Sequence, residues 1–171
     1  MLRPCRLALV LTAGLLLTSL PAVSAAPEAV LYAGAGATID GVAAFNGSRV
    51  FVRSVLHTPK GQVSDLIVPG SSIRFLASTG SRFLGDSADL LEGGVTLKTS
   101  TKFSIHSGCM TASPLSAGAR YTVQLLEKTV YVSVHEGEVQ VHSLRGVRVS
   151  GGKTVAVFCG SPKQELSLIH I

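Results

Sequence analysis

The sequence predicts an all-β domain whose antiparallel strands form either a twisted barrel or a short stack of sheets resembling a β-solenoid. Hydrophobic residues make up 46% of the chain and charged residues 15%, with 18 glycines and no tryptophan. This composition is too apolar for a disordered chain and too rich in glycine for a helical bundle. From Ala29 onward, apolar and polar residues alternate in short runs separated by glycine, serine or proline about every 8 to 12 residues, as in strands.

Ten runs show this alternation most clearly and are the expected strands. They are Arg49 to Val55, Gln62 to Val68, Ser72 to Leu76, Gly94 to Lys98, Lys102 to His106, Arg120 to Leu126, Thr129 to His135, Glu138 to His142, Val147 to Val149 and Lys153 to Val157. The residues between them are typical of turns, as in Thr58 to Gly61, Pro69-Gly70 and Gly151-Gly152. The length of 171 residues predicts one domain with a single core.

The first 25 residues have the three parts of a secretory signal peptide. Arg3 precedes an apolar run from Leu7 to Leu20, Pro21 ends the run, and Val23 to Ala25 supply the small residues that a signal peptidase recognises. The run of about 14 residues is shorter than the roughly 20 needed to span a bilayer. We therefore expect cleavage, no stable membrane span afterwards, and a mature protein in the periplasm or outside the cell.

The net charge of +5 does not predict a nucleic-acid partner. Arg3 and Arg6 lie in the predicted signal peptide, and without these two of the 15 basic residues, 13 remain against 10 acidic residues. The remaining lysines and arginines are scattered singly and form no cluster. We therefore expect no nucleic-acid binding.

Two cysteines, Cys109 and Cys159, remain after removal of the signal peptide. An even number of cysteines in an oxidising compartment favours a disulfide, which would close a loop of about 50 residues and stabilise the fold by roughly 4 kcal/mol. The spacing alone leaves open whether the thiols meet, because pairing depends on the distance between the two Cβ atoms. Two separated cysteines without a CxxC or HxxxH pair do not predict zinc.

Three histidines, His106, His135 and His142, lie on the polar side of their expected strands. If they converged on one face, they could bind a divalent metal together with Glu136 or Glu138. Histidines exposed on strands are more often solvated, so we predict no metal and no other cofactor, and keep these three only as weak candidates. Convergence within about 5 Å would distinguish the two interpretations.

No residue pattern predicts catalysis. The serines in Gly70-Ser71-Ser72 and Gly80-Ser81-Arg82 lie in expected turns, and neither fits the G-x-S-x-G pattern of a serine hydrolase. We therefore expect a protein that is not an enzyme.

A short pattern, Glu-Gly-x-Val-x-(Leu/Val), occurs twice in the chain. Glu92 to Leu97 is the first copy, and Glu136 to Val141, 44 residues further on, is the second. A glycine between two alternating runs is typical of a tight turn or bulge. The two copies predict stacked β units that share one core.

From about Val63 to Pro162 the order of these segments resembles the extracytoplasmic FecR domain, named for the ferric-citrate-type signalling regulators of Gram-negative bacteria. A first Leu-x-x-Gly-x-(Val/Leu)-x-(Val/Leu) motif at Leu90 to Leu97 is followed by a second at Val132 to Val141. The motif positions are Leu90, Gly93, Val95, Leu97, Gly137, Val139 and Val141. The resemblance implies an extracytoplasmic module that binds a protein or takes part in signalling.

The chain departs from these regulators at both ends. It has a secretory signal where they have a cytoplasmic anti-sigma segment and a membrane span, so we expect a stand-alone secreted member without direct contact to a sigma factor. We expect the FecR-like β domain to cover residues 27–162. Leu166 to Ile171 resembles the translated edge of a sequencing adaptor, so residues 165–171 are expected to be a non-native tail and the natural protein to continue past about Lys163.

These observations predict an extracytoplasmic, non-enzymatic FecR-like module whose partner is a protein of the bacterial envelope. One alternative is a structural scaffold that binds cell-wall glycan or another polysaccharide. The other is a small β-barrel that binds a ligand or a metal, which predicts a concave pocket lined by the three histidines.

Overall fold

The computed structural model describes residues 29–160 and 166–169, which form 17 strands. The predicted signal peptide lies outside the described residues, and so do residues 165, 170 and 171 of the expected tail. The described residues form an all-β fold, which confirms the predicted fold class. No helix in this part of the chain is long and apolar enough to cross a membrane.

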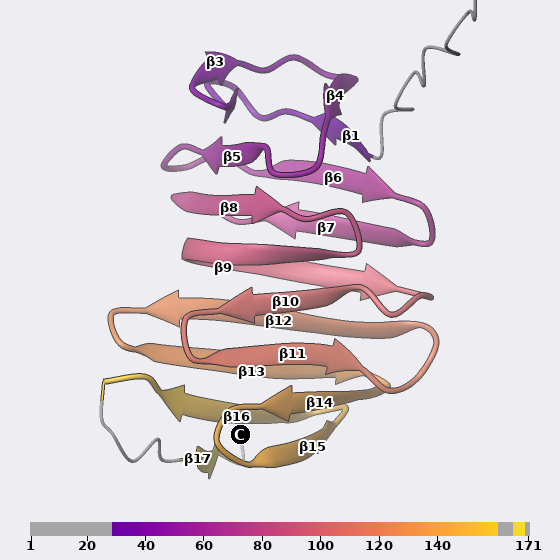
Figure 1. The fold of residues 1–171 in the computed structure, drawn as a ribbon, viewed down its shortest axis with the longest axis vertical. Helices are drawn as coiled ribbons and strands as arrows, with labels where there is room; N and C mark the ends of the chain where they lie inside the picture. Colours follow the sequence, from indigo (N-terminus) through magenta and orange to yellow (C-terminus); the bar gives the residue numbers. More distant parts are fainter. Residues whose placement is uncertain (1–28, 161–165, 170–171) are drawn as a thin grey trace, which may run out of the picture.

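The strands form one continuous sheet that is folded into two stacked layers (Figure 1). Layer A contains, in spatial order, β4 (Ser48–Val50), β1 (Ala29–Tyr32), β6 (Ser64–Val68), β7 (Ser71–Phe75), β9 (Ser87–Thr99), β12 (Ala119–Leu126), β13 (Thr129–Glu136), β16 (Lys153–Phe158) and β17 (Leu166–Ile169). Layer B contains β3 (Val42–Ala43), β2 (Thr38–Ile39), β5 (Val55–Thr58), β8 (Thr79–Phe83), β9 again, β10 (Ser104–Ser107), β11 (Met110–Pro114), β14 (Glu138–His142) and β15 (Gly146–Ser150). All paired strands are antiparallel except β9 with β10.

The layers stay open and do not close into a barrel. Of the two predicted arrangements, the structure therefore has the stack of sheets. Among the described strands, β4 and β17 are the outer strands of layer A, and β3 and β15 are those of layer B. The chain advances along the stack from β1 at one end to β17 at the other by crossing repeatedly between the layers (Figure 1).

One predicted strand is divided by such a crossing. The run Arg49 to Val55 breaks after Val50, because the chain turns out of layer A and enters layer B at Val55. Arg53 in this turn has a φ of 75°. Phe51 and Val52 lie in this turn and are consequently exposed.

The structure also contains strands that the sequence analysis did not predict, among them β8. This strand begins with Thr79, Gly80 and Ser81, which are typical turn residues, yet all three are buried. Gly80 leaves room for the Glu92 side chain, whose Cγ lies 3.1 Å from the position that a Cβ on Gly80 would take. Close packing against β9 therefore requires small residues in β8, and this requirement outweighs their propensity for turns.

The core lies between the inner faces of the two layers. In β13, Val130, Val132 and Val134 are buried, whereas the side chains between them face outward. The largest fully buried side chains are Tyr121, Phe75, Phe83, Leu31, Leu66, Ile73, Leu97 and Ile105. Burial of each large apolar side chain contributes about 1.5 to 3 kcal/mol, which makes this contact between layers the main source of stability.

Tyr121 adds a polar contact between the layers. Its ring is fully buried on β12, and its hydroxyl donates to the carbonyl oxygens of Ala112 (3.2 Å) and Phe103 (3.4 Å) on the opposite side of the core. Burial raises the pKa of this hydroxyl well above its ordinary value, because the phenolate would have to exist without water around it.

The raised pKa of Tyr121 predicts a loss of stability at alkaline pH. Above pH 10 the unfolded chain ionises this tyrosine while the native state keeps it neutral, so stability is full below that pH and falls as the pH rises. We expect this residue to lower the free energy of unfolding by up to about 1.4 kcal/mol per pH unit above pH 10. Tyr121→Phe should remove that slope and cost about 0.5 to 1.5 kcal/mol at pH 7.

Urea unfolding between pH 7 and pH 11 measures both effects. Tyr131→Phe is the matched control, because Tyr131 lies on the outer face of β13 and is not buried in the core. A Tyr121→Phe variant that loses stability with pH as steeply as the natural sequence would contradict the assignment.

Candidate functional site

Gly93 marks the point where β9 passes from layer B to layer A. The residues before it pair with β8 and β10, and those after it pair with β7 and β12. Gly93 has a φ of 77°, and a Cβ there would overlap the Ser78 carbonyl oxygen and lie 2.8 Å from the Cα of Thr79. The Thr79 hydroxyl donates to the Gly94 carbonyl oxygen (2.9 Å) and accepts from the Gly94 N–H (3.0 Å). The backbone therefore stays hydrogen-bonded where its partner strands change.

Gly137, the matching glycine of the second copy, connects β13 in layer A with β14 in layer B. Its φ is also 77°, and a Cβ on it would meet the Ser116 hydroxyl and lie 3.1 Å from the Cα of Ala119. The N–H of the next residue, Glu138, donates to the Ser116 hydroxyl at 3.0 Å. Both copies of the sequence pattern thus form a crossing between the layers, in opposite directions. In each, the N–H of the residue after the glycine donates to a side-chain hydroxyl.

The apolar positions of the motif face the core and not the solvent. Leu90, Val95, Leu97, Val139 and Val141 are each at most 3% exposed. The motif residues therefore determine the architecture of the stack, and none of these five side chains is available to a ligand.

The three histidines are placed on two different faces of the molecule. His106 on β10 and His142 on β14 lie on the outer face of layer B, each in register with Thr111 of β11. His135 lies on β13 in layer A, and its Nε2 is 2.9 Å from the Thr122 hydroxyl. Both His135 and His142 lie on the polar side of their own strands. Because the chain crosses between the layers at Gly137, these two polar sides are the outer faces of opposite layers.

The three histidines do not share one site. His106 and His142 line a hollow of about 340 Å³ beside Cys109, without His135. The Nδ1 of His106 is 2.9 Å from the Thr111 hydroxyl, while the His142 ring lies over Gly146. Within residues 29–160, no group of three histidine, cysteine, aspartate or glutamate side chains is arranged to hold a metal.

Cys109 and Cys159 are joined by a disulfide, with their Cα atoms 5.5 Å apart. Cys109 lies in the turn between β10 and β11 of layer B, and Cys159 follows β16 of layer A. The Cys159 N–H also donates to the Lys128 carbonyl oxygen at 2.7 Å. The bond therefore ties the two layers together at one edge of the C-terminal half.

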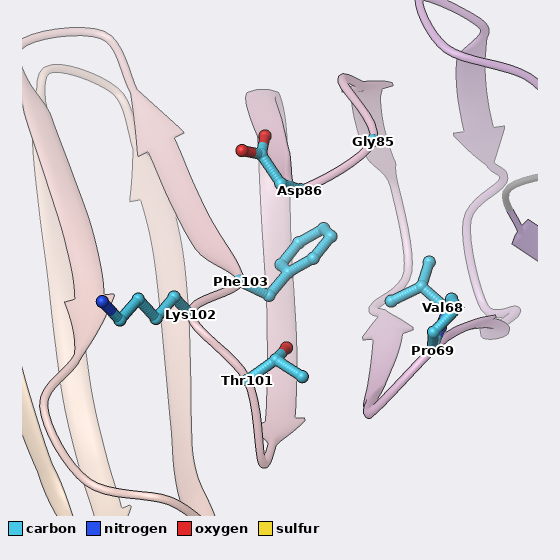
Figure 2. A pocket seen from close by; sticks show the side chains of 7 residues that line it. All are labelled: Val68, Pro69, Gly85, Asp86, Thr101, Lys102 and Phe103. Carbon is cyan, nitrogen blue, oxygen red and sulfur yellow. The ribbon is translucent and has the colours of Figure 1, made fainter.

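A cleft of about 420 Å³ opens at the opposite edge of the stack, between the layers (Figure 2). The end of β6, the β8–β9 turn and the loop from β9 to β10 line it, with Val68, Pro69, Gly85, Asp86, Thr101, Lys102 and Phe103. The Phe103 ring points from the loop toward Val68 and Pro69, whereas Lys102 extends to the other side (Figure 2). Phe103 also stacks on Phe83, with ring centroids 6.4 Å apart, so the floor of the cleft is continuous with the core.

The polar groups of this cleft lie at its rim. The Asp86 carboxylate accepts a hydrogen bond from the Ser87 hydroxyl at 3.0 Å. The Thr101 hydroxyl is hydrogen-bonded with the hydroxyls of Ser71 (3.0 Å) and Thr99 (3.1 Å). The cleft combines an apolar floor with one acidic, one basic and one hydroxyl side chain, and the sequence analysis did not predict that these side chains meet.

The fold and this site define a two-layer antiparallel β-stack with an open cleft at one edge. No known family model matches the sequence, and no curated protein matches it. The fold is similar to two crystal structures, at 1.65 and 2.50 Å resolution, of a putative anti-sigma factor from Parabacteroides distasonis ATCC 8503, with a TM-score of 0.57 and 15% sequence identity. The match covers 68% of this chain and 60% of that protein, so the chain spans less than two thirds of its length. At this identity the likeness extends to the fold alone.

The crossing at Gly93 predicts a large effect of an added methyl group. Gly93→Ala combines the cost of a left-handed backbone, about 1 to 2 kcal/mol, with overlap against Ser78 and Thr79, and we expect a total loss of about 3 kcal/mol or more. Gly152→Ala is the matched control, because Gly152 has a φ of 79° but open space around it, and should lose only about 1 kcal/mol. Urea unfolding of both variants gives the comparison, and equal losses would show that the crossing imposes no steric requirement.

The disulfide predicts a stability that depends on redox conditions. Because it closes a loop of 50 residues, reduction should lower the free energy of unfolding by about 4 kcal/mol. The measurement is thermal unfolding with and without a reducing agent, and the double variant Cys109→Ser/Cys159→Ser should be insensitive to that agent. A natural chain whose stability is unchanged by complete reduction would contradict the prediction.

Proposed function

We propose that this chain is an extracytoplasmic FecR-like module that binds a protein of the bacterial envelope and catalyses no reaction. The observation that carries the proposal is the agreement between motif and fold. Gly93 and Gly137 of the FecR-like motif occupy equivalent crossings in a two-layer stack similar to that of the Parabacteroides protein. The name of that protein associates such a fold with regulation of a sigma factor, and for this chain we adopt the broader role of a signalling or binding domain.

Two features support a location in the periplasm or outside the cell. Residues 1–25 have the sequence of a secretory signal, and Cys109 and Cys159 are joined by a disulfide. Disulfides persist mainly in oxidising compartments, such as the periplasm.

The chemistry of the cleft supports binding over catalysis. A hydroxyl nucleophile requires a neighbouring general base, and the hydroxyl of Thr101 is instead hydrogen-bonded to those of Ser71 and Thr99. The lining contains no histidine or cysteine. Its apolar floor and open mouth suit a side chain presented by another protein.

A scaffold that binds polysaccharide is the second candidate, and the outer face of layer A favours it. A row of hydroxyl side chains crosses four adjacent strands, formed by Thr96, Thr122, Ser133 and Thr154. These hydroxyls are hydrogen-bonded in pairs, Thr96 with Thr122 at 3.0 Å and Ser133 with Thr154 at 2.9 Å. Part of their capacity to bind a sugar is therefore already used.

The proposal predicts export followed by recovery of one envelope protein. The full chain, expressed with its own leader and a C-terminal affinity tag in a Gram-negative host, should reach the periplasm with a new N-terminus near residue 26. Cross-linking in intact cells, capture by the tag and mass spectrometry should recover one membrane or secreted protein in high yield. Gly93→Ala should reduce the yield because it destabilises the fold, and Gly152→Ala should not.

Two results would overturn the proposal. Enrichment of wall glycan without a protein would favour the polysaccharide scaffold. Retention of the full chain in the cytoplasm with its leader intact would contradict the extracytoplasmic location.

A further inference from the structure

Three hollows surround the loop of residues 100–103 and form one groove along an edge of the stack. The first is the cleft of about 420 Å³ described above. The second, of about 250 Å³, lies between the β6–β7 turn and Gly118, and the third, of about 220 Å³, lies against residues 114–117. Thr101 and Lys102 line both the first and the third hollow, and Ser100 lines both the second and the third, so the hollows are contiguous. The turns that border them follow one another along the same edge in Figure 1.

The groove has two apolar places along its length. In the first hollow, Val68 and Phe103 form a floor that is closed below by Phe83. In the third hollow, Leu115 is 46% exposed beside Pro114. A large side chain inserted into the first hollow would extend the core outward, and burial of such a side chain is the usual anchor of a protein interface.

The groove carries two lysines and one aspartate, so its net charge is positive. Among the described residues, the arginines that form ion pairs are Arg74, Arg120 and Arg148, whereas Lys98 and Lys102 form none. Lys98 lines the second hollow, and Lys102 lies between the first and third. Asp86 is the one acidic residue of the lining and borders the first hollow but not the third. Its carboxylate accepts a hydrogen bond from the Ser87 hydroxyl. Complementary charge in a partner would therefore be negative.

The shape of the groove favours an extended segment over a compact small molecule. Small-molecule sites enclose most of the surface of their ligand, whereas these hollows are open to solvent and arranged in series around a loop. An extended peptide can place one side chain in the cleft and the following side chains beside Lys102 and Lys98.

We propose that this groove docks an extended acidic peptide segment of a protein partner, with one large apolar side chain in the cleft and carboxylates beside Lys102 and Lys98. The proposal rests on the proposed function, since it assigns a surface and a partner chemistry to the predicted protein binding. The two lysines that it uses are exposed, and neither belongs to the FecR-like motif.

The test uses the full secreted chain and a displayed library of random dodecamer peptides as the probe. Selected peptides should share one large apolar residue followed by aspartate or glutamate, and their binding should weaken as salt concentration rises. Lys102→Glu should weaken binding at least about fivefold by reversing a rim charge. Pro69→Glu should weaken it at least about tenfold by placing a charge at the apolar cleft.

Matched variants separate the groove from a general charge effect. Lys128→Glu, in the β12–β13 turn at the disulfide edge, and Val42→Glu, on β3, make comparable changes on exposed residues away from the groove. Both should leave binding unchanged, and circular dichroism should show that all four variants keep the fold. Fluorescence anisotropy with the selected peptides provides the affinities.

The proposal is overturned if no peptide is selected, if the selected peptides are basic or lack an apolar residue, or if the groove variants bind as the natural chain does. Binding of dodecanoate at the cleft in the absence of any selected peptide would assign the cleft to a small amphipath instead. Failure of this proposal is distinguishable from failure of the proposed function. If an envelope protein is recovered equally by the natural chain and by both groove variants, the protein-binding function stands and the groove assignment is wrong.

Discussion

Burying the inner faces of two layers requires the chain to cross between them without leaving buried backbone groups unpaired. An unpaired amide in the core would cost about as much as burying one apolar side chain gains. At Gly93 and Gly137 a glycine makes the bend, and a hydroxyl bonds the residue that follows: that of Thr79 at the start of β8 for the first, and that of Ser116 in the β11–β12 loop for the second. Among the described residues, every buried side-chain polar atom has a hydrogen-bond partner. The core, the cleft at one edge and the disulfide at the other all depend on these crossings.

The fold class could be predicted because alternation of apolar and polar residues is a local property. Val130, Val132 and Val134 are recognisable as one face of a strand without knowledge of the rest. Local pattern cannot show when a strand changes layers, so Arg49 to Val55 reads as continuous although the chain turns at residues 51–54. Thr79-Gly80-Ser81 reads as a turn because its burial is imposed by β9, which follows later in the sequence.

The candidate site was harder to predict for the same reason. The prediction that His135 and His142 lie on the polar side of their strands was correct, but the single crossing at Gly137 places them on opposite faces of the molecule. Phe103 and Val68 meet across the cleft only because three turns from separate strand pairs end at one edge. No sequence spacing encodes that meeting, whereas the pairing of Cys109 with Cys159 was one of few possibilities in a sequence with three cysteines.

The disulfide also links two parts of the chain that are made far apart in time. Cys109 follows β10 and Cys159 follows β16, so the bond cannot form before the six strands from β11 to β16 have been synthesised. Until then Cys109 is a free thiol that can exchange with another disulfide. Once formed, the bond holds the end of β16 in layer A beside the β10–β11 turn of layer B, even when the strands between them open.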